Sequence, residues 1–414
     1  MALKKKNFTK EFENDDSKGL IFYVFCIWTF VLLCRPQDIF PILAEIRPAL
    51  LSGVLTLAIV FLRFREIRGP SFSHERQVIL YTALFFVMVF GIPFSLYRKL
   101  SFMTVFAEYI NVILFFYIFF KVINSIRKLK KILLLMCLGN GLYLLFSLIV
   151  GSYYYNRLYF GKMFDPNDLA FFALSFLPLN LIFLGRENHF LAKFGCLACF
   201  GICVLIIILT GSRGGNIAFG FVLCVLMVMK SSTIGKKFKV SLILVCIIFM
   251  INLPANIDRV LTIFSTEEDY NITEETGRIA IWKSGWSIFL NYPLTGVGVG
   301  CFGEALGKER ELKGLETTGW QAAHNMVVQI GVETGIFGLF LFLFLSYNVF
   351  RIFLNVRRSS ISTNLVQVSE MGILGFLGLF ISGMFLSQAY SLYWAFYVVI
   401  SASVNQLLAV EAEV

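Results

Sequence analysis

The chain contains a series of long apolar runs that begins at Leu20 and recurs as far as Leu408, and these runs restrict its possible folds more than any other feature. Several are long enough to form a helix that crosses the roughly 30 Å hydrocarbon core of a bilayer. With 58% hydrophobic and only 15% charged residues, the chain lacks the polar surface that a water-soluble protein of 414 residues needs. We therefore predict one integral membrane domain.

The apolar runs predict an all-α, polytopic membrane protein with about twelve transmembrane helices. The predicted helices cover residues 20–33, 49–63, 78–95, 102–120, 132–150, 168–184, 190–209, 215–229, 238–252, 326–350, 369–386 and 390–408. They divide the chain into a first group of helices within residues 1–251, a large loop at 252–325, and a second group within residues 326–414.

Lys and Arg are concentrated in alternate connections between the apolar runs, with clusters at Arg127–Lys131 and Lys236–Lys239. Because basic residues favour the cytoplasmic side, this pattern predicts a cytoplasmic amino terminus and a large loop on the outer, periplasmic face. The run that starts at Leu20 is not followed by a small-residue cleavage site, so an uncleaved first helix is expected. These clusters account for the net charge of +10, and no nucleic-acid partner is predicted.

The predicted outer loop, residues 252–325, is polar, and its ten carboxylates outnumber its six basic residues. Loops of this length are usually functional or disordered. Ile279, Trp282, Trp286 and Phe289 recur at helical spacing, which predicts an amphipathic helix that lies on the membrane or on the helix bundle. The Asn291-Tyr292-Pro293 sequence should end this helix.

His324 is the one histidine that this topology places on the outer side, since His74 and His189 fall in cytoplasmic connections. It lies where the large loop meets the next membrane helix. An imidazole with an ordinary pKa near 6.5 suits general-base catalysis. The alternative, which position alone favours equally, is a polar residue that satisfies the helix terminus.

Arg213 and Arg278 are the outer-side arginines that we single out. Arg213 lies in Thr210-Gly211-Ser212-Arg213-Gly214-Gly215, a short connection whose glycines and exposed N–H groups favour an anion. Arg278 begins the predicted amphipathic helix, one turn before Trp282. Arginine can bind phosphate oxygens with two parallel hydrogen bonds, so the pair would suit a diphosphate if the two residues converge. Snorkelling to lipid phosphate is the alternative for Arg213.

Acidic residues at or in the membrane have several interpretations. Asp165-Pro166-Asn167-Asp168 has the pattern of a turn and a helix cap. Glu333 lies two to three turns into the helix that follows His324, and its cost in lipid favours a buried role, such as pairing with an arginine. The glycines from Gly296 to Gly300 follow no predicted strand and are interpreted as a flexible turn. No metal or other cofactor is expected, because no compact carboxylate cluster occurs on the outer side.

A set of short motifs, in their order and spacing, resembles the signature of the O-antigen ligase and polymerase superfamily. The motifs are Asp165-Pro166-Asn167-Asp168, Gly211-Ser212-Arg213-Gly214, Thr276-Gly277-Arg278 through Trp282, Asn291-Tyr292-Pro293, the Gly296 to Gly300 repeat, Ala323-His324-Asn325, and Glu333-Thr334-Gly335-Ile336-Phe337-Gly338. The resemblance implies a metal-independent glycosyltransferase of the bacterial inner membrane, with its active site facing the periplasm. Such an enzyme transfers a glycan from undecaprenyl pyrophosphate to an acceptor hydroxyl.

The same resemblance implies roles for individual residues and partners. Arg213 and Arg278 would hold the pyrophosphate, His324 would activate the acceptor, and Glu333, Asp165 and Asn325 would support the site. The expected partners are the undecaprenyl-pyrophosphate-linked glycan, an acceptor such as a second glycan or lipid A core, and membrane lipids. No nucleotide is needed, because the donor already carries its leaving group.

The motifs leave several activities open. The superfamily contains O-antigen ligases, polysaccharide polymerases and protein O-oligosaccharyltransferases, which differ in their acceptor. We favour a ligase or a polymerase, because no additional soluble domain is recognised that would bind a protein substrate. A transporter or flippase for polysaccharide precursors is the main alternative from another class, although the repeated halves typical of transporters are not evident. A purely structural membrane scaffold would leave the outer-side arginines and His324 unexplained.

Overall fold

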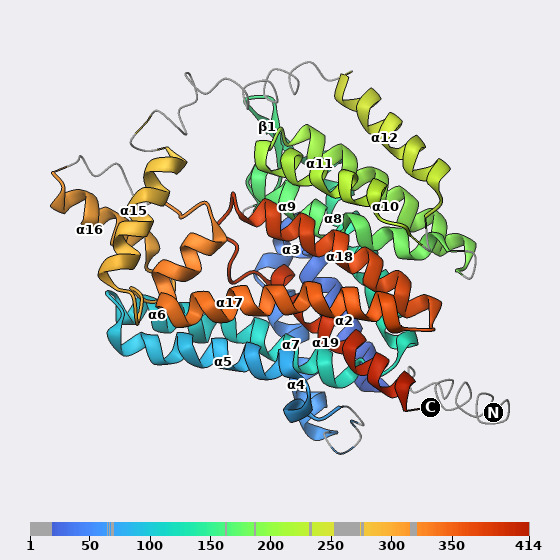
Figure 1. Cartoon of the computed structure of the whole chain (residues 1–414), viewed down its shortest axis with the longest axis horizontal. Coiled ribbons are helices and arrows are strands. Elements are labelled where there is room, and N and C mark those ends of the chain that lie inside the picture. Colours follow the sequence, from blue (N-terminus) through green and yellow to red (C-terminus); the bar gives the residue numbers. More distant parts are fainter. Residues whose placement is uncertain are drawn as a thin grey trace.

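The computed structural model describes residues 19–413, apart from 64, 66, 68–69, 162–163, 186–187, 232–233, 252–273, 275–276 and 315–320. Within this part of the chain, helices form nearly all of the regular structure, and the one sheet has two short strands (Figure 1). The predicted helical fold class is therefore confirmed. The first part of the predicted outer loop, 252–273, lies outside the described residues.

Nine helical stretches among the described residues are long and apolar enough to cross a membrane. They are α2 (Leu20–Cys34) with α3 (Pro36–Ile39); α5 (Arg76–Gly91) with the 3-10 turn η5 (Ile92–Phe94); α6 (Arg98–Met103), the π-helical turn η6 (Thr104–Tyr109) and α7 (Ile110–Val122); α8 (Ile126–Val150); α9 (Pro166–Asn180) with η7 (Leu181–Leu184); α10 (Phe190–Leu209); α17 (Met326–Ser359); α18 (Thr363–Gly383); and α19 (Leu392–Ala412). The chain is thus a multi-pass membrane protein.

Three shorter helices coincide with the remaining predicted spans. They are α4 (Pro48–Leu62), α11 (Arg213–Val228) and α12 (Lys236–Ile251). Each of the twelve predicted segments therefore overlaps a helix, and the number of helices that cross the bilayer stays a prediction. The short 3-10 turns η2 (Pro41–Ala44) and η4 (Phe72–His74) lie in the connections before α4 and α5.

The long helix α17 runs through the length of the bundle, with α5 and α7 on one side and α18, α9, α10 and α11 on the other (Figure 1). It packs directly against α5, α18 and α19. The interior between these helices is filled mainly by aromatic and aliphatic side chains, such as Phe342 stacked on Trp394 with ring centroids 4.6 Å apart. The first and last described helices, α2 and α19, contribute to the same continuous core.

Helix α17 breaks at Gly335, which has φ 67° and ψ −165°. Residues of the Gly296–Gly300 turn replace the hydrogen bonds that the break removes. Val297 and Gly298 donate their N–H groups to the carbonyls of Val332 (2.9 Å) and Glu333 (3.0 Å), and Ile336 donates its N–H group to the Pro293 carbonyl (2.7 Å). The predicted turn is therefore correct, but it is bonded to the broken helix rather than free.

The amphipathic helix predicted after Gly277 is present as α15 (Arg278–Asn291), which ends as predicted just before Tyr292. Its buried face is rotated from the predicted one. Phe289 is buried as predicted, but it is joined by Ile281, Gly285 and Ile288, while Trp286 is 59% exposed. Gly285 allows this orientation, since a Cβ there would lie 2.7 Å from Val328. A second small core forms between α15, the unpredicted helix α16 (Phe302–Leu312) and the start of α17.

A short β-hairpin joins α8 to α9 and was not predicted. Strands β1 (Ser152–Tyr154) and β2 (Arg157–Tyr159) pair antiparallel through a turn at Tyr155 and Asn156, whose φ angles of 48° and 58° are those of a two-residue hairpin turn. Tyr153, Tyr154 and Tyr155 are exposed. The hairpin brings Arg157 to the start of α9, as described below.

The two ends of the helix bundle carry different connections. At one end, which we call the cleft end, the hairpin, the large loop and the α18–α19 connection meet. Two hydrogen bonds join these elements to their neighbours. Leu96 donates its N–H to the Val297 carbonyl (3.0 Å), and Gln388 Nε2 donates to Asp168 Oδ1 (2.8 Å). At the other, which we call the far end, Asn405 Nδ2 bonds to Glu75 Oε2 at 3.0 Å.

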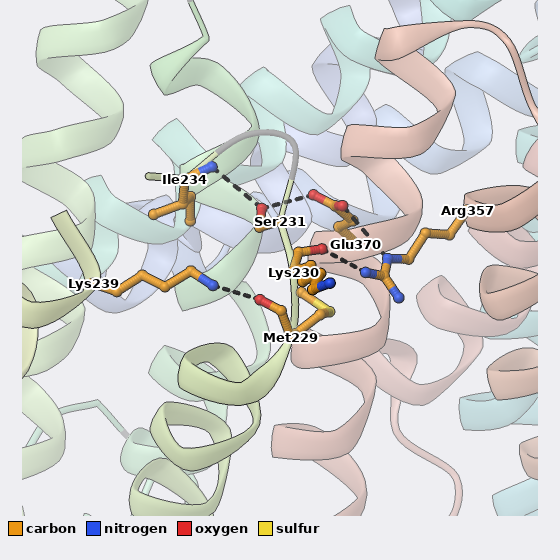
Figure 2. Close-up of polar contacts among 7 residues, drawn as sticks. All are labelled: Met229, Lys230, Ser231, Ile234, Lys239, Arg357 and Glu370. Carbon is orange, nitrogen blue, oxygen red and sulfur yellow. Dashed lines mark hydrogen bonds and ion pairs between the residues drawn. The ribbon is translucent and has the colours of Figure 1, made fainter. Parts of the chain in front are cut away.

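A buried polar cluster at the far end joins α17 and α18 to the α11–α12 connection (Figure 2). Glu370 of α18 is 2% exposed; it accepts a hydrogen bond from Ser231 Oγ (2.7 Å) and pairs with Arg357 Nε (3.5 Å). Arg357 also donates to the Lys230 carbonyl, and Lys239 donates to the Met229 carbonyl. The cost of a carboxylate buried in a membrane helix is thus offset by partners from neighbouring elements.

Candidate functional site

His324 occupies a constrained backbone position at the cleft end. Its φ of 48° is in the left-handed region, which a histidine seldom adopts. Hydrogen bonds hold the backbone at Ala323 and at His324. Trp282 Nε1 of α15 donates a hydrogen bond to the carbonyl of Ala323 (3.1 Å), and His324 N–H donates to Ser387 Oγ in the α18–α19 connection (2.9 Å). Two distant elements therefore fix the position of His324.

Asn325, rather than His324, satisfies the start of α17. Its side-chain Oδ1 accepts hydrogen bonds from the N–H groups of Val327 (2.9 Å) and Val328 (3.1 Å), which is the geometry of an N-cap. The alternative interpretation of His324 as the residue that satisfies the helix terminus is therefore wrong. Asn325 supports the site through the backbone, and the His324 imidazole is left for another role.

Arg213 and Arg278 are each the first residue of a helix, α11 and α15 respectively. A narrow cleft, too tight in this structure to admit a water molecule, connects their surroundings. Arg278 lines it together with Ser212 and Gly214, the sequence neighbours of Arg213; the other lining residues are Asn167, Gly215, Ser382, Phe385 and Leu386. The structure thus brings Arg278 beside the Ser212–Gly215 segment, although these residues are far apart in the sequence.

The glycines of this segment are needed for close approach. A Cβ at Gly214 would lie 2.8 Å from the Phe385 side chain, and a Cβ at Gly215 would lie 2.9 Å from Ala170. Ser212 caps α11 by accepting the Gly215 N–H at 3.2 Å. The start of α11 therefore fits tightly between α9 and the end of α18, which accounts for glycines on the carboxyl side of Arg213.

Asp165 caps α9, as the sequence predicts, because its Oδ1 accepts the N–H groups of Asn167 (2.7 Å) and Asp168 (2.8 Å). Arg157 of the hairpin extends this network, and sequence reasoning missed it. It donates to Asn167 Oδ1 at 2.7 Å and to the Thr210 carbonyl at 2.9 Å. Arg157 therefore links the start of α9 to the connection that carries Arg213.

The α18–α19 connection is a second element of the site that sequence reasoning missed. Ser387 holds the His324 backbone, and Gln388 Nε2 donates to Asp168 Oδ1 at 2.8 Å. Ala389 N–H donates to Gln329 Oε1 at 3.2 Å. One short segment thereby joins α9 and α17 at the cleft. Its composition, Ser-Gln-Ala, resembles that of many loops and gave no signal.

Glu333 lies away from this cluster and does not pair with an arginine among the described residues. Its side chain is 2% exposed, and its Oε1 accepts the N–H of Phe302 at 3.1 Å, at the first turn of α16. A carboxylate is favourable there, because the first N–H groups of a helix have no partner within it. The predicted pairing with an arginine is therefore wrong; Glu333 holds α16 against the broken helix α17.

The electrostatic surroundings of His324 connect it to the other candidate residues. Burial lowers the pKa of its imidazole, the positive charge of Arg278 lowers the pKa further, and the negative charge of Asp165 opposes this by raising it. Arg278 and Asp165 therefore each lie within electrostatic range of His324. A lowered pKa keeps the imidazole neutral near pH 7, which is the form that accepts a proton.

This arrangement predicts how the activity of the protein depends on pH. A general base at His324 would be reactive in its neutral form, so activity should then fall as the pH drops through its lowered pKa. Asp165→Asn preserves a helix cap but removes the charge that raises that pKa, so the midpoint of the acid limb should move to lower pH. Arg278→Gln should move the midpoint of the residual activity upward. A pH profile of kcat/KM checks both directions, and an unchanged midpoint in both variants would exclude this role for His324.

Helices α9, α11, α15 and α17 all begin at this cluster. The peptide dipoles place partial positive charge at helix N-termini, so their convergence favours a bound anion. The start of α15 has no side-chain cap, unlike the other starts, because its N-cap is Gly277. With Arg278 at the same position, the start of α15 combines unpaired N–H groups with a positive charge, which favours a nearby anion.

Comparison with known proteins agrees with this chemistry. Residues 198–343 match the family model described as O-antigen ligase. This segment belongs to the O-antigen ligase family. The O-antigen ligase segment contains Arg213, Arg278 and His324, as well as the Gly296–Gly300 turn and the break in α17. The resemblance seen in the sequence motifs is thereby confirmed, and a function of the ligase or polymerase type is supported. No curated protein matches the chain.

Proposed function

We propose that this protein is a metal-independent glycosyltransferase that transfers a glycan from undecaprenyl pyrophosphate to an acceptor hydroxyl at the periplasmic face of the bacterial inner membrane. The observation that carries the proposal is the meeting of Arg278, the Ser212–Gly215 segment and His324 at one end of the bundle. The O-antigen ligase match over residues 198–343 supports the same class of reaction.

In the proposed reaction, Arg213 and Arg278 hold the pyrophosphate of the donor at the starts of α11 and α15. The acceptor oxygen attacks the anomeric carbon while the bond from that carbon to the phosphate oxygen breaks, and undecaprenyl pyrophosphate leaves with the bonding electrons. His324 removes the proton from the acceptor hydroxyl. A single displacement of this kind inverts the anomeric configuration.

The arginines and the helix N-termini act where negative charge develops on the leaving group. A preorganised donor of this type contributes about 2.7–4 kcal/mol in other enzymes. The lowered pKa of His324 suits the base, since it is neutral before the reaction and near a cation that discourages protonation from solvent. We favour an O-antigen ligase or polysaccharide polymerase over a protein O-oligosaccharyltransferase, because the matching family model is described as O-antigen ligase.

The test is a transfer assay in proteoliposomes that contain the purified chain and a polyprenyl-pyrophosphate-linked glycan, with EDTA and without nucleotide. Lipid A core, a second lipid-linked glycan and a Ser-containing protein are offered separately as acceptors. Glycan transfer to one of them, detected by mass spectrometry, supports the proposal and identifies the activity. If the donor glycan instead crosses the bilayer and no acceptor is modified, the transporter alternative is correct.

A further inference from the structure

The last part of α17 carries a stripe of polar residues on one face. Asn348, Arg351, Asn355 and Arg358 are separated by three, four and three residues, so they line up along the helix. Between Val349 and Arg358 the positions outside the stripe are apolar apart from Arg357, and Phe353 and Val356 are fully buried. The stripe lies at the far end of the bundle, away from the candidate glycosyltransferase site.

This stripe forms one wall of a cavity of about 400 Å³ between α5, α17 and α19. The volume is within the range of small-ligand sites. Polar groups line most of the cavity, which is unusual between membrane helices. The lining residues are Glu75, Arg76, Gln77, Asn348, Arg351, Ile352, Leu354, Asn355, Arg358 and Asn405.

The charges in the cavity do not balance. Arg76, Arg351 and Arg358 face a single carboxylate, Glu75, which is 5% exposed and accepts hydrogen bonds from Asn405 Nδ2. Burial raises the pKa of Glu75, which weakens its negative charge further. The N-terminus of α5 adds partial positive charge at Arg76. The cavity therefore has an excess of positive charge.

Arg357, on the same helix as the stripe, has both an ion-pair partner and a hydrogen-bond acceptor. It pairs with Glu370 and donates to the Lys230 carbonyl (Figure 2). Helical spacing places it on the face opposite the stripe, and it does not line the cavity. For Arg351 and Arg358, the described part of the chain contains no such ion pair. The Arg76 guanidinium carbon lies 5.0 Å from the centroid of the Phe344 ring, a cation–π contact that uses none of its N–H donors.

We propose that this far-end cavity binds the phosphate group of an anionic phospholipid, with Arg351, Arg358 and Arg76 as its ligands. Arginine matches phosphate geometry, and basic pockets between the ends of membrane helices are suited to lipid headgroups. The amides of Asn348, Gln77 and Asn405 provide donors and acceptors for the hydroxyl groups of a headgroup such as glycerol. The same chemistry would accept free phosphate, which the experiment separates.

The experiment measures the thermal unfolding midpoint of the full chain, delipidated in a neutral detergent, against increasing dihexanoyl phosphatidylglycerol. A ligand that binds the folded state raises the midpoint in a saturable way. The Arg351→Gln/Arg358→Gln double variant is expected to need at least tenfold more lipid for half of the shift. Arg351→Lys/Arg358→Lys, which keeps the charges but loses the planar donors, should need an intermediate concentration.

Three controls decide the outcome. Lys236→Gln removes an exposed charge at the same end, outside the cavity, and should respond as the unchanged chain does. Dihexanoyl phosphatidylcholine should give a smaller shift than phosphatidylglycerol. Inorganic phosphate that matches phosphatidylglycerol would identify a free phosphate site and overturn the lipid assignment. An equal response of both lipids, or an unchanged response of the double glutamine variant, would overturn the site itself. No glycan transfer is measured, so the result is independent of the proposed function.

Discussion

Replacement of His324 by asparagine is expected to lower the rate of glycan transfer by about 10²–10⁴-fold, which is the usual contribution of a general base. Asparagine is the informative substitution, because it tolerates the left-handed backbone that His324 adopts at φ 48°. If His324 only served to adopt the left-handed backbone, asparagine or glycine at this position would retain activity. The expected loss is in kcat, with little change in donor affinity, since Arg213 and Arg278 remain.

His189→Asn is the matched control for this experiment. His189 caps α10 at the far end, where its Nδ1 accepts the Leu191 N–H at 3.3 Å, and asparagine can retain the cap. Its transfer rate should equal that of the unchanged chain. Initial rates in proteoliposomes at matched protein content provide the measurement. Activity of folded His324→Asn within about threefold of the unchanged chain would remove His324 from the mechanism.

Gly335→Ala is expected to destabilise the protein by about 3 kcal/mol or more. Gly335 combines φ 67° with ψ −165°, a region that essentially only glycine occupies. An added Cβ would lie 2.5 Å from the Leu294 carbonyl oxygen and 2.8 Å from that of Pro293. Both neighbours are backbone atoms, so the substitution must displace either the Pro293–Leu294 backbone, which leads into the Gly296–Gly300 turn, or the broken helix.

Gly331→Ala tests the specificity of this effect within the same helix. Gly331 lies before the break, and a Cβ there would meet Leu339 at 3.5 Å, an ordinary contact. It should change the unfolding midpoint little or raise it slightly, because alanine favours helices. Thermal unfolding in detergent and the yield of monodisperse protein report the difference. Equal midpoints for the two variants would show that the break at Gly335 contributes little to stability.

The helices could be predicted from the sequence because a segment that crosses the hydrocarbon core of a bilayer must be long, apolar and helical. Every predicted apolar segment overlaps a helix, and α15 ends where Asn291-Tyr292-Pro293 predicted. The orientation of α15 could not be predicted. Hydropathy does not distinguish a side chain that faces lipid from one that faces protein, and the decisive residue is Gly285, whose missing side chain allows close packing on Val328.

The site was predicted to the extent that it depends on residue type. His324, Arg213 and Arg278 stand out because charged groups are costly near a membrane and because their motifs resemble a known family. Arg157 and Ser387 did not stand out, since their roles arise from contacts with Asn167 and with the His324 backbone. The break at Gly335 was missed for the same reason: its missing hydrogen bonds are supplied by residues some forty positions earlier in the chain.

The α18–α19 connection has a consequence for biosynthesis. Its Ser387 fixes the His324 backbone, and the adjacent Ser382, Phe385 and Leu386 form a wall of the cleft. A nascent chain that has inserted its helices only as far as α17 therefore contains both arginines and the histidine, yet it lacks the surfaces that hold them together. We therefore expect the proposed site to be completed only when α18 and α19 enter the bilayer.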